Sequence, residues 1–107
     1  MKLTDIRDLL LTVGVPVSHY HTLKESKYIV WAEDGQSGSI HGDNCMEEQI
    51  MQGTIDYYTK TEYDTNVGKI QQALNDNEVS FRLNSVQYEE ETNFIHYEWI
   101  FEVDLDG

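Results

Sequence analysis

Two histidines, His19 and His21, are separated by one residue, a spacing that would place both imidazole rings on the same side of a strand. Imidazole nitrogens bind zinc, and a third ligand could come from His41 or Glu33. A zinc site needs three or four converging ligands, and the pair by itself supplies only two. We therefore expect no bound metal and no cofactor. A small metal-dependent hydrolase that uses these histidines and nearby acidic residues is the alternative enzyme interpretation.

The other residues capable of chemistry are similarly isolated. His96 and Glu98 share one side of a predicted strand, where they could form a general acid–base pair, but a solvated sheet face explains them without catalysis. Cys45 is the only cysteine, which excludes an intrachain disulfide. The neighbouring Glu47 and Glu48 disfavour the thiolate that a catalytic cysteine needs. We expect no catalytic residue.

A run of three glutamates occupies residues 89–91 and lies close in sequence to further acidic residues. Carboxylates bind divalent cations, but the spacing is not that of a calcium-binding loop and is typical of a solvated hairpin tip. The glycines of the segment DGQSGSIHG, at positions 35, 38 and 42, are too dispersed for a phosphate-binding loop and are not followed at once by a helix. Neither segment predicts a ligand site.

The composition describes a single acidic domain over residues 1–107. The chain has 20 acidic against 7 basic side chains and a net charge of −13. Phosphate contacts need clustered lysine and arginine, so this balance argues against wrapping nucleic acid or docking on an anionic membrane. An acidic surface instead repels a DNA strand that must pass without sticking. No stretch has the length of a membrane span, and the N-terminal residues lack the pattern of a signal peptide.

Hydrophobic periodicity and turn signals predict the elements that would position these side chains. Helical spacing predicts a helix over residues 4–13 and a second helix that Asp64 caps, ending at residues 75–77. We expect a turn at Asp34 and Gly35, a bulge at Gly53 and a hairpin turn at residues 89–93. Strands are predicted over residues 17–22, 28–33, 37–42, 47–59, 79–84 and 95–103. This order predicts an α+β fold, a mostly antiparallel β-sheet with two α-helices packed on one face.

Alternation along the last strand separates core from surface. Trp99, Phe101 and Tyr97 share one phase and, with Phe81 and Leu83, are predicted to pack under the helices. Apolar residues on the opposite phase would be exposed, and exposed aromatic and apolar side chains are typical of subunit contacts. The predicted interface residues are Tyr58, Tyr63, Phe94 and Ile100.

Between the predicted strand and the second helix, the segment TIDYYTKTEYDTNVGKIQQAL (54–74) passes through a polar hinge at residues 60–64. The hinge contains no proline, no glycine and no obvious set of ligands. Its residue types do not indicate chemistry, so a structural role is expected.

Three segments, KYIVWAEDG (27–35), GTIDYYTKTEYDTNVGKIQQAL (53–74) and RLNSVQYEEETNFIHYEWIFEVD (82–104), resemble the tail terminator proteins of tailed bacteriophages and prophages. These are tail-completion, or head–tail joining, proteins. The likeness extends from the first helix through the last strand and lies in structural segments, not in catalytic motifs. The resemblance implies a virion protein that forms a homohexameric ring at the head-proximal end of the tail tube. Such a ring ends tube polymerisation and offers a surface to the head connector.

The resemblance also implies the partners of the ring. They are copies of the same chain, the major tail tube protein and the head-completion protein, within the tail or neck of a virion assembled in the bacterial cytoplasm. Double-stranded DNA would pass through the lumen without specific binding, and no membrane is involved. The carboxylates expected to line the lumen are Glu89, Glu90, Glu91, Glu98 and Glu102. Tube contact would come from residues 34–44 or from a sheet edge. The alternatives are another small neck or tail protein, or an acidic module that neutralises a basic host protein.

Overall fold

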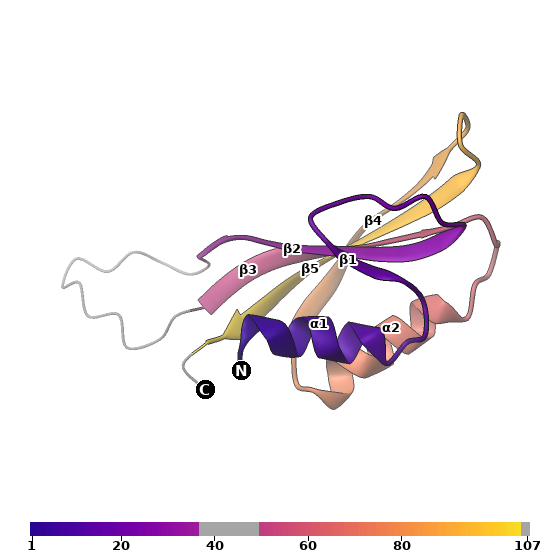
Figure 1. Ribbon diagram of the computed structural model, residues 1–107. Coiled ribbons are helices and arrows are strands. Elements are labelled where there is room, and N and C mark those ends of the chain that lie inside the picture. Colours follow the sequence, from indigo (N-terminus) through magenta and orange to yellow (C-terminus); the bar gives the residue numbers. More distant parts are fainter. Residues whose placement is uncertain (37–49, 106–107) are drawn as a thin grey trace.

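The computed structural model describes residues 1–36 and 50–105, in which two helices pack against a five-stranded sheet (Figure 1). In chain order the elements are α1 (Leu3–Leu11), β1 (Val17–His19), β2 (Lys27–Gln36), β3 (Ile50–Thr59), α2 (Asn66–Asp76), β4 (Ser80–Glu89) and β5 (Phe94–Asp104). The strand predicted over residues 37–42 lies outside the described residues, as does the start of the strand predicted over 47–59.

The strand order is β1-β2-β3-β5-β4, with β1 parallel to β2 and all other neighbours antiparallel. Both helices lie on the same side of the sheet (Figure 1). The predicted α+β class, with a mostly antiparallel sheet and two helices on one face, is therefore confirmed. The hairpin turn predicted at residues 89–93 is also confirmed, since the Asn93 amide donates to the Glu89 carbonyl at 2.8 Å between β4 and β5.

The helices share one sheet face because each has a single apolar side. Ile6 and Leu10 of α1 and Ile70 and Leu74 of α2 are completely buried. Trp99 is also completely buried, and its indole Nε1 donates a 3.0 Å hydrogen bond to Gln71 Oε1 on α2. The other strand residues buried in this layer are Ile29, Trp31, Ile55, Tyr57, Phe101 and Val103. Alternation along β2, β3 and β5 places these side chains on the helix side.

The predicted turn at Asp34 and Gly35 is wrong, because β2 continues through both residues to Gln36. The pairing register shifts between Glu33 and Gly35, so the irregularity lies in β2 and not at Gly53 on β3.

Gly53 is required for a different reason, the packing of the sheet around it. A Cβ atom there would collide with the Ala32 carbonyl and lie 2.7 Å from the Phe101 ring, so the sheet packs around the missing side chain.

One predicted core residue is exposed. Trp99 and Phe101 are completely buried, and Tyr97 and Phe81 are partly buried against the core, but 44% of Leu83 is accessible to solvent. Alternation places Leu83 on the helix face, opposite Trp99. However, β4 is an edge strand, so no further strand covers Leu83 on its outer side, and the pairing register shifts immediately after this residue.

We expect Trp99→Ala to lower the free energy of unfolding by about 3–5 kcal/mol, because a fully buried indole and its bond to α2 are both lost. Urea denaturation monitored by circular dichroism measures the change. The matched control is Leu83→Ala, for which we expect roughly 1 kcal/mol or less because the side chain is already half in water. Equal losses for the two variants would contradict this assignment of the core.

Candidate functional site

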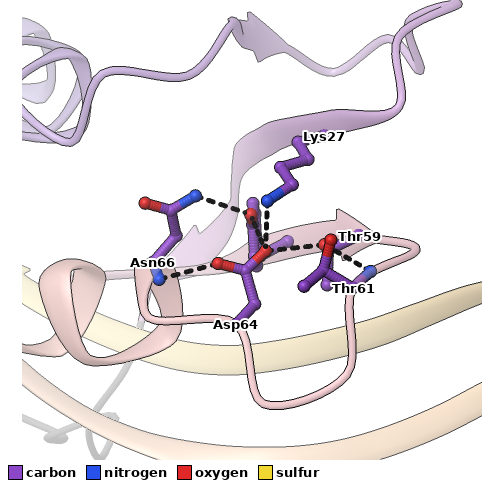
Figure 2. A network of polar contacts seen from close by, with 6 residues as sticks. Lys27, Thr59, Thr61, Asp64 and Asn66 are labelled. Atoms are coloured by element: carbon purple, nitrogen blue, oxygen red, sulfur yellow. Dashed lines mark hydrogen bonds and ion pairs between the residues drawn. The ribbon is translucent and has the colours of Figure 1, made fainter.

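The polar hinge is organised around one buried carboxylate (Figure 2). Asp64 is 8% exposed, and its Oδ2 accepts hydrogen bonds from the Tyr57 hydroxyl at 2.7 Å and the Thr59 hydroxyl at 2.6 Å. The same oxygen lies 3.3 Å from Lys27 Nζ, while Oδ1 accepts from the Asn66 amide at 2.9 Å. One side chain thereby joins β2, β3 and the first residue of α2.

The predicted cap of the second helix is displaced by one residue. Thr65 occupies the N-cap position without a side-chain hydrogen bond, and Asp64 instead satisfies the amide of Asn66 from outside the helix. Burial raises the pKa of Asp64, but the hydrogen bonds from Thr59, the Asn66 amide and Tyr57 outweigh it and hold this pKa at about 2. The carboxylate is therefore ionised and fully partnered, which suits a structural joint and not a proton donor.

Tyr63, immediately before this joint, is 89% exposed and has a φ of 57°. A bulky side chain rarely adopts this left-handed conformation, which glycine and asparagine prefer. The neighbouring Asp64 network holds the backbone there, so the tyrosine is presented to solvent at a defined position. The predicted exposure of Tyr63 is confirmed, and its role at an interface stays a prediction.

The sheet side opposite the helices, here called the helix-free face, collects most of the other candidate residues. Register places Tyr58 beside His96, Asp56 beside Glu98, and Gln52 beside Glu102 across β3 and β5. On β4 the same face continues with Arg82, Ser85, Gln87 and Glu89. Polar and aromatic side chains thus form one continuous surface on this face.

His96 lies at the centre of the carboxylates on the helix-free face. Its Nε2 is 2.7 Å from Asp56 Oδ1, and its Nδ1 is 3.8 Å from a Glu89 carboxylate oxygen. The hydrogen bond to Asp56 raises the pKa of His96, against the opposing effect of burial. The acid–base pair of His96 and Glu98 that the sequence allows, but that we did not expect, does not form: Glu98 accepts from the Ser85 hydroxyl at 3.3 Å and lies 3.5 Å from the side-chain amide nitrogen of Asn84.

Aromatic rings cover the end of this face next to the hinge. The Tyr58 ring stacks on His96 at 4.3 Å and on Tyr28 at 4.8 Å between ring centroids. Phe94 meets both tyrosines edge-on at 6.0 Å, and the Lys60 ammonium lies 5.0 Å above the Phe94 ring. Burial, followed by the charge of Asp56, raises the pKa of Tyr58 to about 12, so its hydroxyl stays protonated.

The four predicted interface residues differ in their exposure to solvent. Tyr58, Phe94 and Ile100 all lie on the helix-free face, and each is half-buried, not fully exposed. Only Tyr63 is almost completely accessible. Alternation predicts which sheet face a side chain occupies. It does not predict that neighbouring rings on that face cover one another, as those around Tyr58 and Phe94 do.

Three of the five predicted lumen carboxylates, Glu89, Glu98 and Glu102, lie on the helix-free face. Glu89 closes β4 and is half-buried, and Glu90 and Glu91 are exposed in the hairpin tip. Glu98 lies in the middle of the helix-free face and Glu102 towards its other end, both half-buried. Asp56, which the sequence did not single out, joins this set through its bond with His96.

His19 and His21, the two histidines considered as metal ligands, are separated by the end of the strand. β1 stops at His19 because Tyr20 adopts a φ of 74°, so His21 does not share a strand face with His19. His19 Nε2 lies 2.6 Å from Glu33 Oε1, and its ring stacks on Trp31 at 4.0 Å. Glu33 therefore meets His19 as a direct hydrogen-bond partner.

Within residues 1–36 and 50–105, no group of three or more histidine, cysteine or acidic side chains is arranged to hold a metal ion. The possible ligand His41, the single cysteine Cys45, and Glu47 and Glu48 lie outside the described residues, as does most of the 34–44 segment considered for tube contact.

Comparison of the chain with protein-family models and with curated proteins found no match. Among the described residues, no helix is both long enough and apolar enough to cross a bilayer. The function proposed below is therefore argued from the fold, from the contacts just described and from the sequence resemblance.

We expect Asp64→Asn to destabilise the protein by about 2–4 kcal/mol at neutral pH, because a buried, hydrogen-bonded charge is removed from its donors. The folded-state pKa of Asp64, about 2, lies below its ordinary value of 3.8. Its contribution is therefore present above pH 3.8 and is lost as the pH falls through 2. Urea unfolding of both proteins at several pH values tests this: the difference in unfolding free energy should shrink in acid, and a constant difference would contradict it.

The histidine on the helix-free face should give the opposite pH dependence. The pKa of His96 is raised above 6.5 in the folded state, so its contribution is fully present below pH 6.5 and is lost as the pH rises through the folded-state pKa. We expect His96→Gln to destabilise the protein more at about pH 5.5 than at about pH 8.5. Thermal unfolding at the two pH values provides the measurement, with His21→Gln, an exposed histidine, as the control.

Proposed function

We propose that this protein is a structural virion component of the tail terminator class, which forms a ring at the head-proximal end of a phage tail tube and catalyses no reaction. The sequence resemblance is the starting point. The α+β architecture, with both helices on one side of a sheet, is compatible with it. The observation that carries the proposal is the acidic helix-free face, which gives one side of the domain a charge suited to lining a DNA channel.

The charge of the helix-free face supports this role. Asp56, Glu89, Glu98 and Glu102 all lie on it, while Arg82 is the only arginine or lysine of the described strands on the same face. A low-dielectric wall that carries one sign of charge repels a polyanion along its whole length. A duplex passing such a wall would make no lasting phosphate contact, because those contacts need lysine or arginine.

The contacts on the same face favour assembly over catalysis. His96 is bonded to Asp56, and the Ser85 hydroxyl donates to Glu98 and not to a base. Among the described residues of this face, no hydroxyl is paired with a histidine in the manner of an activated nucleophile. The polar groups are hydrogen-bonded to one another, which is the arrangement of a solvated structural surface.

A ring of such subunits must overcome self-repulsion. Each chain carries a net charge of −13, and salt screens exposed charges over about 10 Å at 0.1 M ionic strength. We expect ring formation to strengthen as ionic strength rises from very low values, and the end of the tail tube to act as a template. Sedimentation velocity of the protein across salt concentrations, with and without purified tail tubes, measures both effects. A protein that neither oligomerises at any salt concentration nor binds tubes would refute the ring.

Reversing the lumen charge should affect DNA passage and not folding. We expect the combined variant Glu98→Lys and Glu102→Lys to keep a near-normal thermal midpoint, because both side chains are on the solvated face. Each new cation would bind phosphate, so DNA ejection from particles assembled with the variant should slow. The matched control is Glu25→Lys with Glu62→Lys, which adds the same charge on exposed residues outside the sheet faces. Equal ejection with both variants would contradict the lumen assignment.

A further inference from the structure

The two edges of the described sheet differ in how well they resist another strand. β1 at one edge is three residues long, whereas β4 at the other edge has ten. Natural edge strands are commonly short or carry proline or lysine, because an unpaired row of N–H and C=O groups binds other strands. The β4 segment SFRLNSVQYE contains neither proline nor lysine. β4 therefore has the length and composition of an edge that accepts a further strand.

The side chains of β4 are unusually accessible for a strand of this length. All ten are exposed or half-buried, whereas β2, β3 and β5 each contain buried residues. Leu83, Val86 and Tyr88 are 44%, 50% and 60% exposed, and they form an apolar stripe on the helix side of β4. The hairpin end of β4 extends away from both helices, which leaves this stripe accessible (Figure 1). Exposed apolar stripes of this kind mark contacts with other molecules.

A second, antiparallel copy of β4 matches the apolar stripe residue by residue. Directly opposite side chains in an antiparallel pair point to the same side of the sheet. Asn84 is an extra residue in β4, where its register with β5 shifts, so two paired copies each step over it. With a two-fold axis at Val86, each Val86 lies opposite its own counterpart and each Leu83 lies opposite Tyr88 of the other copy. The whole stripe is then covered by apolar side chains.

The same register brings opposite charges together on the helix-free face. It places Arg82 of each copy opposite Glu89 of the other, so the two-fold axis gives this pair twice. Arg82 Nη1 donates to Asn84 Oδ1 at 3.0 Å, and within residues 1–36 and 50–105 the guanidinium has no ion pair. Glu89 contacts Thr92 and His96, but an ionised carboxylate has about four acceptor sites and can accept from Arg82 as well.

The charge of the strand also selects its partner. β4 carries one arginine and one glutamate, whereas β5 carries three carboxylates and neither lysine nor arginine. An acidic strand like β5 would add repulsion against Glu89, but a second β4 supplies one arginine for each glutamate. The exposed Glu90 and Glu91 follow in the hairpin tip, beyond the paired residues, where water and salt screen them.

We infer that two copies of this chain pair through β4, antiparallel about a two-fold axis at Val86, and join their sheets into one continuous sheet. The contact uses the same surface on both copies, so it closes after two chains. It goes beyond the proposed ring, which needs a head-to-tail contact, and it concerns the protein away from a tail tube. The helix-free faces of the two copies lie on the same side of the joined sheet.

A substitution at the two-fold axis tests the contact. Sedimentation equilibrium of the wild-type protein should show a dimer. In Val86→Lys two ammonium groups face each other, so we expect the dimer dissociation constant to rise at least about ten-fold. The matched control is Leu11→Lys, which adds the same charge on α1 at a side chain of nearly equal exposure, 51% against 50%, and should leave the dimer unchanged. A monomeric wild-type protein, or equal dimerisation of the two variants, would overturn the inference.

A charge exchange tests the register and holds even if Val86→Lys does not fold. Arg82→Glu alone brings like charges together twice in its homodimer, and so does Glu89→Arg alone. We therefore expect each homodimer to be at least about ten-fold weaker than the wild type. Mixed at equal concentration, the two variants restore both opposite-charge pairs in one heterodimer, so native mass spectrometry should show the heterodimer at nearly the wild-type level.

The control mixture combines Glu89→Arg with Arg7→Glu, which has the same net charges but changes an exposed arginine of α1. Equal heterodimer formation in the control mixture would mean that net charge alone drives association, and would contradict the inferred register. Absence of the heterodimer from the test mixture would contradict it too. Neither measurement involves tail tubes, so both outcomes are independent of the proposed ring.

Discussion

The buried carboxylate of Asp64 is the contact on which the arrangement of this domain depends. A carboxylate is stable away from water only when hydrogen bonds replace its hydration, and Asp64 obtains them from Tyr57, Thr59, Lys27 and the amide of Asn66. These donors come from two strands and from the start of α2. Satisfying them together sets the direction in which α2 leaves the sheet. The helix then runs back beside α1 and leaves the other sheet face without a helix.

That division between two sheet faces explains how so acidic a chain folds. The apolar side chains concentrate under the helices, where Trp99, Phe101 and Tyr57 are completely buried. The carboxylates of β3 and β5 occupy the opposite face, where water and a histidine reduce their mutual repulsion. When it is protonated, His96 between Asp56 and Glu89 supplies a local positive charge, and the stacked ring of Tyr58 covers one side of it. The face is therefore stable without becoming neutral.

The same contact links the core of the domain to its proposed assembly. Tyr63 is held in a left-handed conformation directly before Asp64, so the rigidity of the joint extends to the most exposed large side chain. A flexible hinge of the same sequence length would lose more entropy on ordering a tyrosine at an interface. The hinge thus has a structural function in the monomer, and its exposed tyrosine stays a predicted interface residue.

The sequence by itself determined the α+β class, both helices, the β4–β5 hairpin and the buried phase of β5, because each follows from short-range periodicity and turn chemistry. It also indicated the polar phase on which Glu98 and Glu102 lie. Only the tertiary structure decided which residues meet. The bond between Asp56 and His96 joins residues 40 apart and depends on strand register, which alternation does not specify. Strand pairing likewise decided that β1 ends at His19, that β2 continues through Gly35 and that Leu83 is exposed on an edge strand. The burial of Asp64 also depends on the tertiary structure, because its donors come from three elements.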